Sequence, residues 1–256
     1  EPGFKNDYGR RYYRNSSINN YIPAIKVITD AGGVVVRMGD NTMTTLPHLP
    51  NVIDYAFSSK KSPLLDLYLT KHCRFFLGTD TGPIHVANLF LKDALITNMY
   101  HWMFAYPLRK NNRGIYKHVY SKVHRRYLTF HEVLSDDWRL QSIFRDIDDN
   151  YELTENTPED IALAVSEYLQ CHFSNNFSLS QNQIDVNKRR ISQARIIYDK
   201  FNLSDDSDKF NPSDDSDNLT ETQIKYRIAS RVSINTQGSM CDSYLQKYLH
   251  NPYRAN

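Results

Sequence analysis

Apolar and polar positions at the start of the chain follow two different periods. Apolar residues recur three and four places apart after Ser16 or Ser17, either of which can cap a helix. Val34-Val35-Val36 then forms an uninterrupted apolar run after a Gly32-Gly33 break, which predicts a short strand covered on both faces. The apolar positions of the expected helix are Ile18, Tyr21, Ile22, Ile25 and Ile28.

Residues 52–97 repeat a strand–helix–strand pattern. Strands are expected at 52–55, 74–77 and 94–97, one helix follows Ser62-Pro63, and a second covers 83–90. Strands and helices that alternate at this spacing predict a parallel sheet with right-handed crossovers. The expected fold class is therefore α/β, a Rossmann-like parallel sheet with flanking helices.

The pattern weakens after about residue 98. Residues 98–114 resemble a loop, a short strand is expected at 127–130, and a helix start is expected near His131. Thr157-Pro158 predicts a capped helix, and a further helix is expected at about 184–201.

These elements divide the chain into an α/β domain, residues 1–150, and a mostly helical C-terminal extension, residues 151–256. The extension contains an acidic, serine-rich insertion at about 204–218, which cannot bury a core and is expected to be a mobile surface loop. It lacks the ligand spacing of an EF-hand calcium loop.

Composition narrows the class of protein. The chain has 256 residues, 40% of them hydrophobic, and 31 basic against 29 acidic residues, a balance that argues against a general nucleic-acid binder. No run approaches the roughly 18 apolar residues of a membrane span, so no transmembrane segment is expected.

The three cysteines form no CxxC pair, which favours a reducing, cytoplasmic compartment without disulfides or zinc. The chain starts at Glu1 without methionine, so an upstream region is expected.

The segment that gives the strongest indication of a binding site follows the strand expected at 74–77. Thr79, Asp80, Thr81 and Gly82 form a polar turn that leads at once into a helix carrying His85. At the carboxyl end of a parallel strand, a helix N-terminus offers backbone N–H groups and partial positive charge to a phosphate. The alternative is that Asp80 or Thr81 only caps the helix. The turn contains neither a Walker motif nor the GxGxxG of dinucleotide folds.

Two further segments are candidates for the same ligand-binding crevice at the carboxyl ends of the strands. Arg37, Gly39 and Asp40 follow the Val34–Val36 run, and an arginine leaving a buried strand suits a phosphate or carboxylate. An Arg37–Asp40 surface pair is the alternative reading. Arg14 and Asn15, ahead of the first helix, are either a third rim of this crevice or part of a solvated loop.

Other motifs are weaker. The histidines show no HExxH spacing, and no GxSxG nucleophile elbow occurs. A basic, tyrosine-containing stretch at 117–126 either contacts an anionic polymer or membrane surface, or is a solvated face. No metal ligand and no catalytic residue is assigned from the sequence.

The segment from Thr79 to Ala87 resembles the D-[TS]-G-x-x-H-x-A motif in the C-terminal domain of glycosyltransferase family 9, the lipopolysaccharide heptosyltransferases. The chain is also similar, over roughly residues 1–135, to a family of bacterial glycosyltransferases encoded with surface-polysaccharide genes. The segments that carry this second likeness are Tyr13-Arg14-Asn15-Ser16, Asn20 to Ile25, Gly32 to Asp40, Val52 to Ala56 and Cys73 to Gly78.

The resemblance implies a GT-B architecture, in which residues 1–150 are the nucleotide-sugar-binding domain and the N-terminal partner domain is missing. By carry-over, Asp80, Thr81, Gly82 and His85 bind the donor diphosphate, while Arg37 and Asp40 lie at the donor or acceptor rim. The implied activity is metal-independent and cofactor-free transfer of a sugar from a nucleotide-sugar to a glycan or glycolipid acceptor, in the cytoplasm or at the inner face of the cell membrane. Two alternatives remain open: a nucleotide-sugar epimerase of the same architecture, and a non-catalytic nucleotide- or carbohydrate-binding module.

Overall fold

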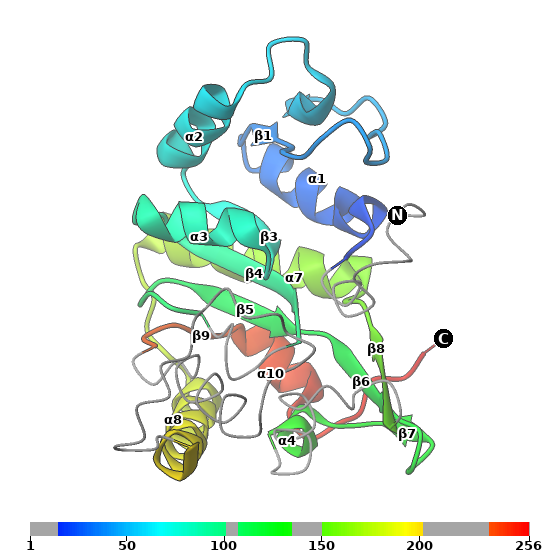
Figure 1. Cartoon of the computed structure of the whole chain (residues 1–256), viewed down its shortest axis with the longest axis vertical. Helices are drawn as coiled ribbons and strands as arrows, with labels where there is room; N and C mark the ends of the chain where they lie inside the picture. The colour runs from blue at the N-terminus through cyan, green and yellow to red at the C-terminus, as the bar shows by residue number, and fades with distance from the viewer. Residues whose placement is uncertain (1–14, 101–106, 135–149, 202–235, 256) are drawn as a thin grey trace, which may run out of the picture.

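The computed structural model describes residues 15–100, 107–134, 150–201 and 236–255, without the side chains of 197–201. Its centre is a four-stranded parallel sheet in the order β3-β4-β5-β9 (Figure 1). The expected α/β class with a parallel sheet and flanking helices is confirmed, and it is compatible with a Rossmann-like fold. The strands are β3 (Phe76–Thr79), β4 (Ala94–Met99), β5 (Arg113–Tyr116) and β9 (Ser239–Met240).

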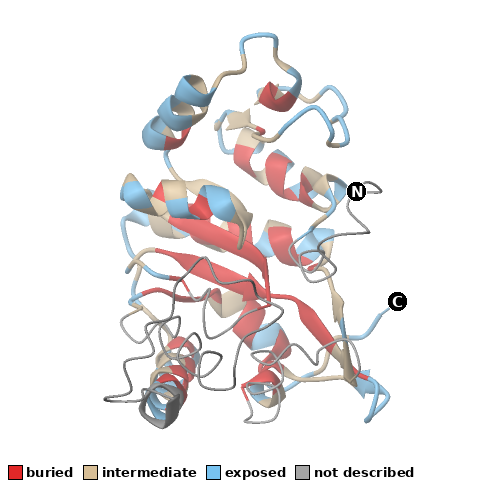
Figure 2. Ribbon diagram, in the orientation of Figure 1, coloured by how far each residue is buried: buried red, intermediate tan, exposed pale blue. Residues whose placement is uncertain are grey.

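Strand β4 is the most enclosed part of the sheet. It pairs in parallel with β3 on one side and with β5 on the other, and all six of its residues are buried. Helices α3 (Gly82–Leu89) and α7 (Pro158–Ser174) also pack against it. Figure 2 shows this buried centre under more exposed helices. A strand covered in this way carries a nearly continuous apolar sequence, which is why its position could be predicted.

The strand expected at 34–36 occupies a different setting from the predicted one. Strand β1 (Val35–Val36) pairs only with β2 (Val52–Ile53), in a separate two-stranded parallel sheet. Val34 is 63% exposed and both β1 residues are half-buried, so the expected cover on both faces is wrong. The physical reason is that, among the described strands, β1 has the single partner β2, while α1 (Ile22–Asp30) packs on it.

Segments after residue 150 contribute to two of the sheets. Strand β8 (Tyr151–Thr154) pairs antiparallel with β6 (His118–Ser121), which also pairs with β7 (Arg126–Tyr127). Strand β9 extends the parallel sheet beyond β5. The acidic insertion expected at about 204–218 lies outside the described residues.

Most expected helices are present, with shifted ends. The helix expected after Ser16 or Ser17 begins as a 3-10 turn, and neither serine caps it: Ser17 precedes this turn without a side-chain capping bond. Pro23 therefore lies in the first turn of α1, where the missing N–H costs little. Ser62 and Thr157 cap their helices with their side chains, as the sequence indicates. The remaining helices are η2 (Ile18–Tyr21), η3 (Tyr55–Phe57), α2 (Pro63–His72), α4 (Phe130–Val133), α8 (Gln181–Phe201) and α10 (Asp242–Tyr248).

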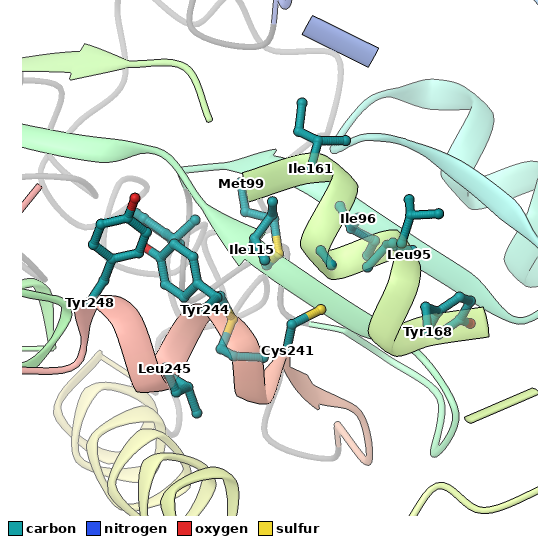
Figure 3. Packing of buried hydrophobic residues seen from close by; sticks show 14 of the residues in the cluster. Leu95, Ile96, Met99, Ile115, Ile161, Tyr168, Cys241, Tyr244, Leu245 and Tyr248 are labelled. Carbon is teal, nitrogen blue, oxygen red and sulfur yellow. The ribbon is translucent and has the colours of Figure 1, made fainter. Parts of the chain in front are cut away.

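The hydrophobic core lies between the sheet, α7 and α10 (Figure 3). Leu95 and Ile115 from neighbouring strands are fully enclosed, as are Ile161 and Tyr168 on α7. Cys241, Tyr244 and Leu245 close the core from the β9–α10 side. This packing fixes the carboxyl ends of β3, β4 and β5 relative to one another, and those ends carry the candidate site.

Candidate functional site

The turn between β3 and α3 is short and closed by a backbone hydrogen bond. The Thr81 backbone N–H donates to the Thr79 carbonyl oxygen at 2.8 Å, which closes the turn tightly. Thr81 is the N-cap residue of α3, but its side chain makes no capping bond. The alternative that Thr81 serves only as a side-chain cap therefore has no support in this geometry.

Few N–H groups at the start of α3 remain for a ligand. Pro83 has no N–H, and the Ile84 N–H donates to the Thr81 carbonyl oxygen at 3.1 Å. Within the described part of the chain, the Gly82 N–H has no acceptor, and a Cβ added at Gly82 would meet nothing within 4 Å. His85 is exposed on the same helix. The turn thus presents the Gly82 amide and the positive helix end to open space, beside the half-buried hydroxyl groups of Thr79 and Thr81, which lie 3.5 Å apart.

Gly78 does not share this open setting. A Cβ added there would lie 2.7 Å from the Phe76 ring. The Phe76 side chain therefore covers this face of Gly78, so a ligand cannot approach the backbone there as it can at Gly82.

The end of β4, next to this turn, is polar and held in an unusual backbone conformation. Thr97 Oγ1 donates to the Gly78 carbonyl oxygen at 3.3 Å and lies 2.6 Å from the Tyr21 hydroxyl oxygen. Asn98 is buried with a φ of 54°, and the β4–β5 register is irregular between Ile96 and Met99. Left-handed residues of this kind need surrounding contacts to hold them.

Those contacts come from Asn156, between β8 and α7. The Asn98 N–H donates to Asn156 Oδ1 at 2.7 Å, and the Asn156 N–H donates to Asn98 Oδ1 at 2.7 Å. Asn156 Nδ2 also donates to the Tyr116 carbonyl oxygen at 2.6 Å. These hydrogen bonds tie the end of β4 to the end of β5.

The segment that precedes α1 crosses this edge of the sheet. Lys117, directly after β5, donates from Nζ to the Asn15 carbonyl oxygen at 3.0 Å. Glu155 accepts hydrogen bonds from the Ser17 N–H and the Asn20 side-chain amide, both at 2.9 Å. Asn15 therefore lies at the carboxyl edge of the parallel sheet, whereas Arg14 lies outside the described residues.

Arg37 and Asp40 are engaged elsewhere. Arg37 is buried and forms an ion pair with Asp54 at 3.0 Å, and it also donates to the Thr44 carbonyl oxygen. Asp40 accepts hydrogen bonds from the backbone and hydroxyl of Thr42, which lower the pKa of its carboxyl group. The Arg37–Asp40 pair considered from the sequence is replaced by the Arg37–Asp54 pair.

Gly39, between these two residues, has a φ of 142°, and a Cβ there would clash with the Met43 sulfur. The glycine is thus explained by the local chain path. The polar partners of Arg37 and Asp40 described above, Asp54, Thr44 and Thr42, all lie outside the β3–α3 turn.

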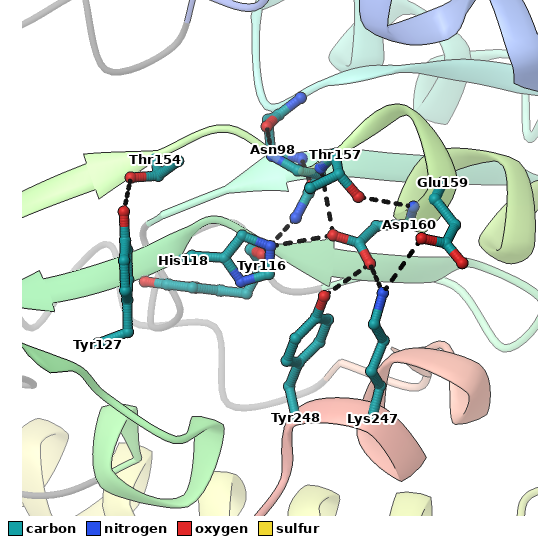
Figure 4. A network of polar contacts seen from close by, with 11 residues as sticks. Asn98, Tyr116, His118, Tyr127, Thr154, Thr157, Glu159, Asp160, Lys247 and Tyr248 are labelled. Atoms are coloured by element: carbon teal, nitrogen blue, oxygen red, sulfur yellow. Dashed lines mark hydrogen bonds and ion pairs between the residues drawn. The ribbon is translucent and has the colours of Figure 1, made fainter. Parts of the chain in front are cut away.

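A second polar centre, around Asp160 at the start of α7, is shown in Figure 4. Its carboxylate accepts hydrogen bonds from Lys247 Nζ at 2.8 Å and the Tyr248 hydroxyl at 2.9 Å, and lies 3.0 Å from His118 Nε2. Burial by itself would raise the pKa of Asp160, but the hydrogen bonds from His118 and Lys247 outweigh it and hold that pKa below its usual range. Tyr253 stacks on the His118 ring, with centroids 4.0 Å apart. These contacts fix α10 and the C-terminal residues to α7, which is a structural role.

The basic stretch at 117–126 is therefore not one solvated face. Lys117 and His118 at its start are buried, whereas residues 122–126 are exposed. Sequence reasoning did not identify Thr97, Asn98, Lys117 or Asn156 as site residues. A polar residue directly after an apolar strand was the available signal for Thr97 and Asn98.

Searches of protein-family models, of curated proteins and of solved structures each found no match to this chain. The described residues contain no group of three or more His, Cys, Asp or Glu side chains placed to hold a metal ion. Among the helices that the structure describes, none has the length and apolar character needed to cross a membrane.

Proposed function

We propose that this chain binds a nucleotide-sugar at the carboxyl edge of β3, β4 and β5 and is the donor-binding half of a metal-independent GT-B glycosyltransferase. The observation that carries the proposal is the β3–α3 turn, where the Gly82 amide and the start of α3 face open space beside Thr79, Asp80 and Thr81. A diphosphate is the part of the donor that this arrangement suits, because the helix end supplies both an N–H donor and a favourable dipole.

The proposed chemistry is transfer of the sugar to a hydroxyl group of a glycan or glycolipid acceptor. The acceptor oxygen forms a bond to the anomeric carbon, and the bond from that carbon to the phosphate oxygen breaks. The nucleoside diphosphate leaves with the electron pair, and a general base takes the hydroxyl proton. The helix end would stabilise the charge that develops on the leaving diphosphate.

Calorimetric titration of the full chain with UDP-, GDP- and ADP-sugars, which carry a diphosphate, and with CMP-sugars, which carry a monophosphate, tests the proposal. Saturable binding of one nucleotide class is expected, with the affinity reduced at least about tenfold by Asp80→Ala/His85→Ala. The matched control is Asp30→Ala/His72→Ala, which removes the same residue types from exposed positions on α1 and α2. Equal affinity in both double variants would contradict the assignment of this turn. Binding that is confined to the turn but gives no sugar transfer to any acceptor would favour a binding module.

A further inference from the structure

Lys117 occupies an unusual position for a lysine. It follows β5 directly, its N–H bonds to the Met99 carbonyl oxygen at 2.7 Å, and the residue is only 4% exposed. An ammonium group has three hydrogen-bond donors, and a buried one is costly unless those donors are satisfied. Within the described part of the chain, its Nζ has one hydrogen bond, to the Asn15 carbonyl oxygen.

The charge of Lys117 also lacks a close counterion in the described residues. Glu155 is the carboxylate near enough to influence it, but the oxygen of Glu155 that is nearest the N-terminal segment accepts hydrogen bonds from Ser17 and Asn20. No ion pair within 4.0 Å joins Lys117 to a described carboxylate. Burial lowers the pKa of Lys117, and Glu155 opposes this shift only in part. A bound anion would therefore stabilise the charged form of Lys117.

The position of Lys117 relative to the β3–α3 turn fits a ligand with more than one anionic group. Strands β3, β4 and β5 are consecutive neighbours, so the end of β5 is two strand spacings, about 10 Å, from the end of β3. Asn15, whose carbonyl oxygen is the present partner of Lys117, is an exposed residue. A phosphoryl oxygen in the place of this one carbonyl oxygen would accept the same hydrogen bond and would also neutralise the charge.

We propose that Lys117 is an anion-binding residue of the carboxyl edge, where its ammonium group binds a phosphoryl oxygen in place of the Asn15 carbonyl. The identity of the ligand as a nucleotide-sugar rests on the proposed function, but the phosphoryl contact itself is testable without it. Lys117 thereby extends the site from the β3–α3 turn across β4 to the end of β5.

The test is titration of the full chain with inorganic phosphate and with pyrophosphate, followed by calorimetry and by backbone amide NMR. Lys117→Met is expected to weaken pyrophosphate binding at least about tenfold, and Lys117→Arg to retain most of it. Lys122→Met is the control, because Lys122 directly follows the far end of β6 and its Nζ lies 3.9 Å from Glu152 Oε1. Its affinity for pyrophosphate should equal that of the unmodified chain.

Stability provides a second readout that separates a ligand-binding lysine from a structural one. Replacing a buried, poorly paired charge with methionine should leave the free energy of unfolding unchanged or raise it. Marked destabilisation by Lys117→Met together with unchanged pyrophosphate affinity would overturn the inference, and so would the absence of pyrophosphate binding to the unmodified chain. Pyrophosphate binding that depends on Lys117, combined with no binding of any nucleotide-sugar, would support the inference and contradict the proposed function.

Discussion

Asn98 and Asn156 are joined by two reciprocal hydrogen bonds, in each of which the backbone N–H of one residue donates to the side-chain oxygen of the other at 2.7 Å. The two residues are 58 positions apart in the sequence. Their pairing holds Asn98 in the left-handed conformation at the end of β4 and fixes the loop before α7 against the same edge. The candidate site therefore depends on a long-range contact between two buried amides.

This pairing predicts different costs for two substitutions of Asn98. Asn98→Gly removes the side-chain hydrogen bonds and should lower the free energy of unfolding by about 1–3 kcal/mol. Asn98→Ala loses the same bonds and also places a Cβ in a left-handed conformation, which adds about 1 kcal/mol. Chemical denaturation of both variants measures the difference. A smaller loss for alanine than for glycine would contradict the account.

Substitution by alanine should affect stability at Gly39 but hardly at Gly82. Gly39→Ala combines a φ of 142° with crowding against Met43, so a loss of stability of about 1 kcal/mol or more is expected. Gly82→Ala meets open space, and its stability should change by less than about 0.5 kcal/mol. If Gly82 faces a bound diphosphate, this alanine will nevertheless weaken nucleotide-sugar binding. Thermal unfolding with and without ligand separates the two effects.

We expect Arg37 to stabilise the folded chain and not to bind the ligand. Arg37→Ala leaves Asp54 without its ion-pair partner in a largely enclosed position, and should destabilise the chain by about 3 kcal/mol. The folded fraction should keep its affinity for nucleotide-sugars, measured by calorimetry at a temperature where the variant is folded. Loss of binding without loss of stability would instead place Arg37 at the ligand.

The Asp160 network predicts a dependence of stability on acid pH. The pKa of Asp160 is depressed in the folded chain, so its contribution is complete above the ordinary carboxyl value of 3.8 and is lost as the pH falls further. Asp160→Asn should destabilise the chain by about 3 kcal/mol at neutral pH. As the pH falls below about 4, this carboxyl group takes up a proton first in the unfolded chain, so the free energy of unfolding of the unmodified chain should fall toward that of the variant. A constant difference across this range would refute the assignment.

Local sequence patterns were sufficient for the elements that local interactions determine. Apolar β4, and the caps of α2 and α7, follow from residues within a few positions of each other. The burial of β1 on both faces was predicted wrongly, because the cover of a strand depends on which distant strands pair with it.

Strand β5 was not predicted because it begins with arginine and glycine. Arg113 can be buried because its guanidinium group donates hydrogen bonds to the carbonyl oxygens of Lys110, Asn112 and Phe177. The last of these is 64 residues away and invisible to a local pattern. The same reason explains why Lys117, which follows β5, was placed in a basic surface stretch. The β3–α3 turn could be found because a strand end, two threonines and a helix start are contiguous in sequence.

The central claim is that a nucleotide-sugar binds at the carboxyl edge of β3, β4 and β5. Backbone amide NMR of the full chain, titrated with UDP-, GDP-, ADP- and CMP-sugars, tests it most directly. The account predicts that one nucleotide class shifts the amide signals of Thr81 and Gly82 most, with accompanying shifts at Asn98 and Lys117. Shifts confined to the Asp160 network or to the Arg37–Asp40 segment, or no shifts with any of the four classes, would contradict it.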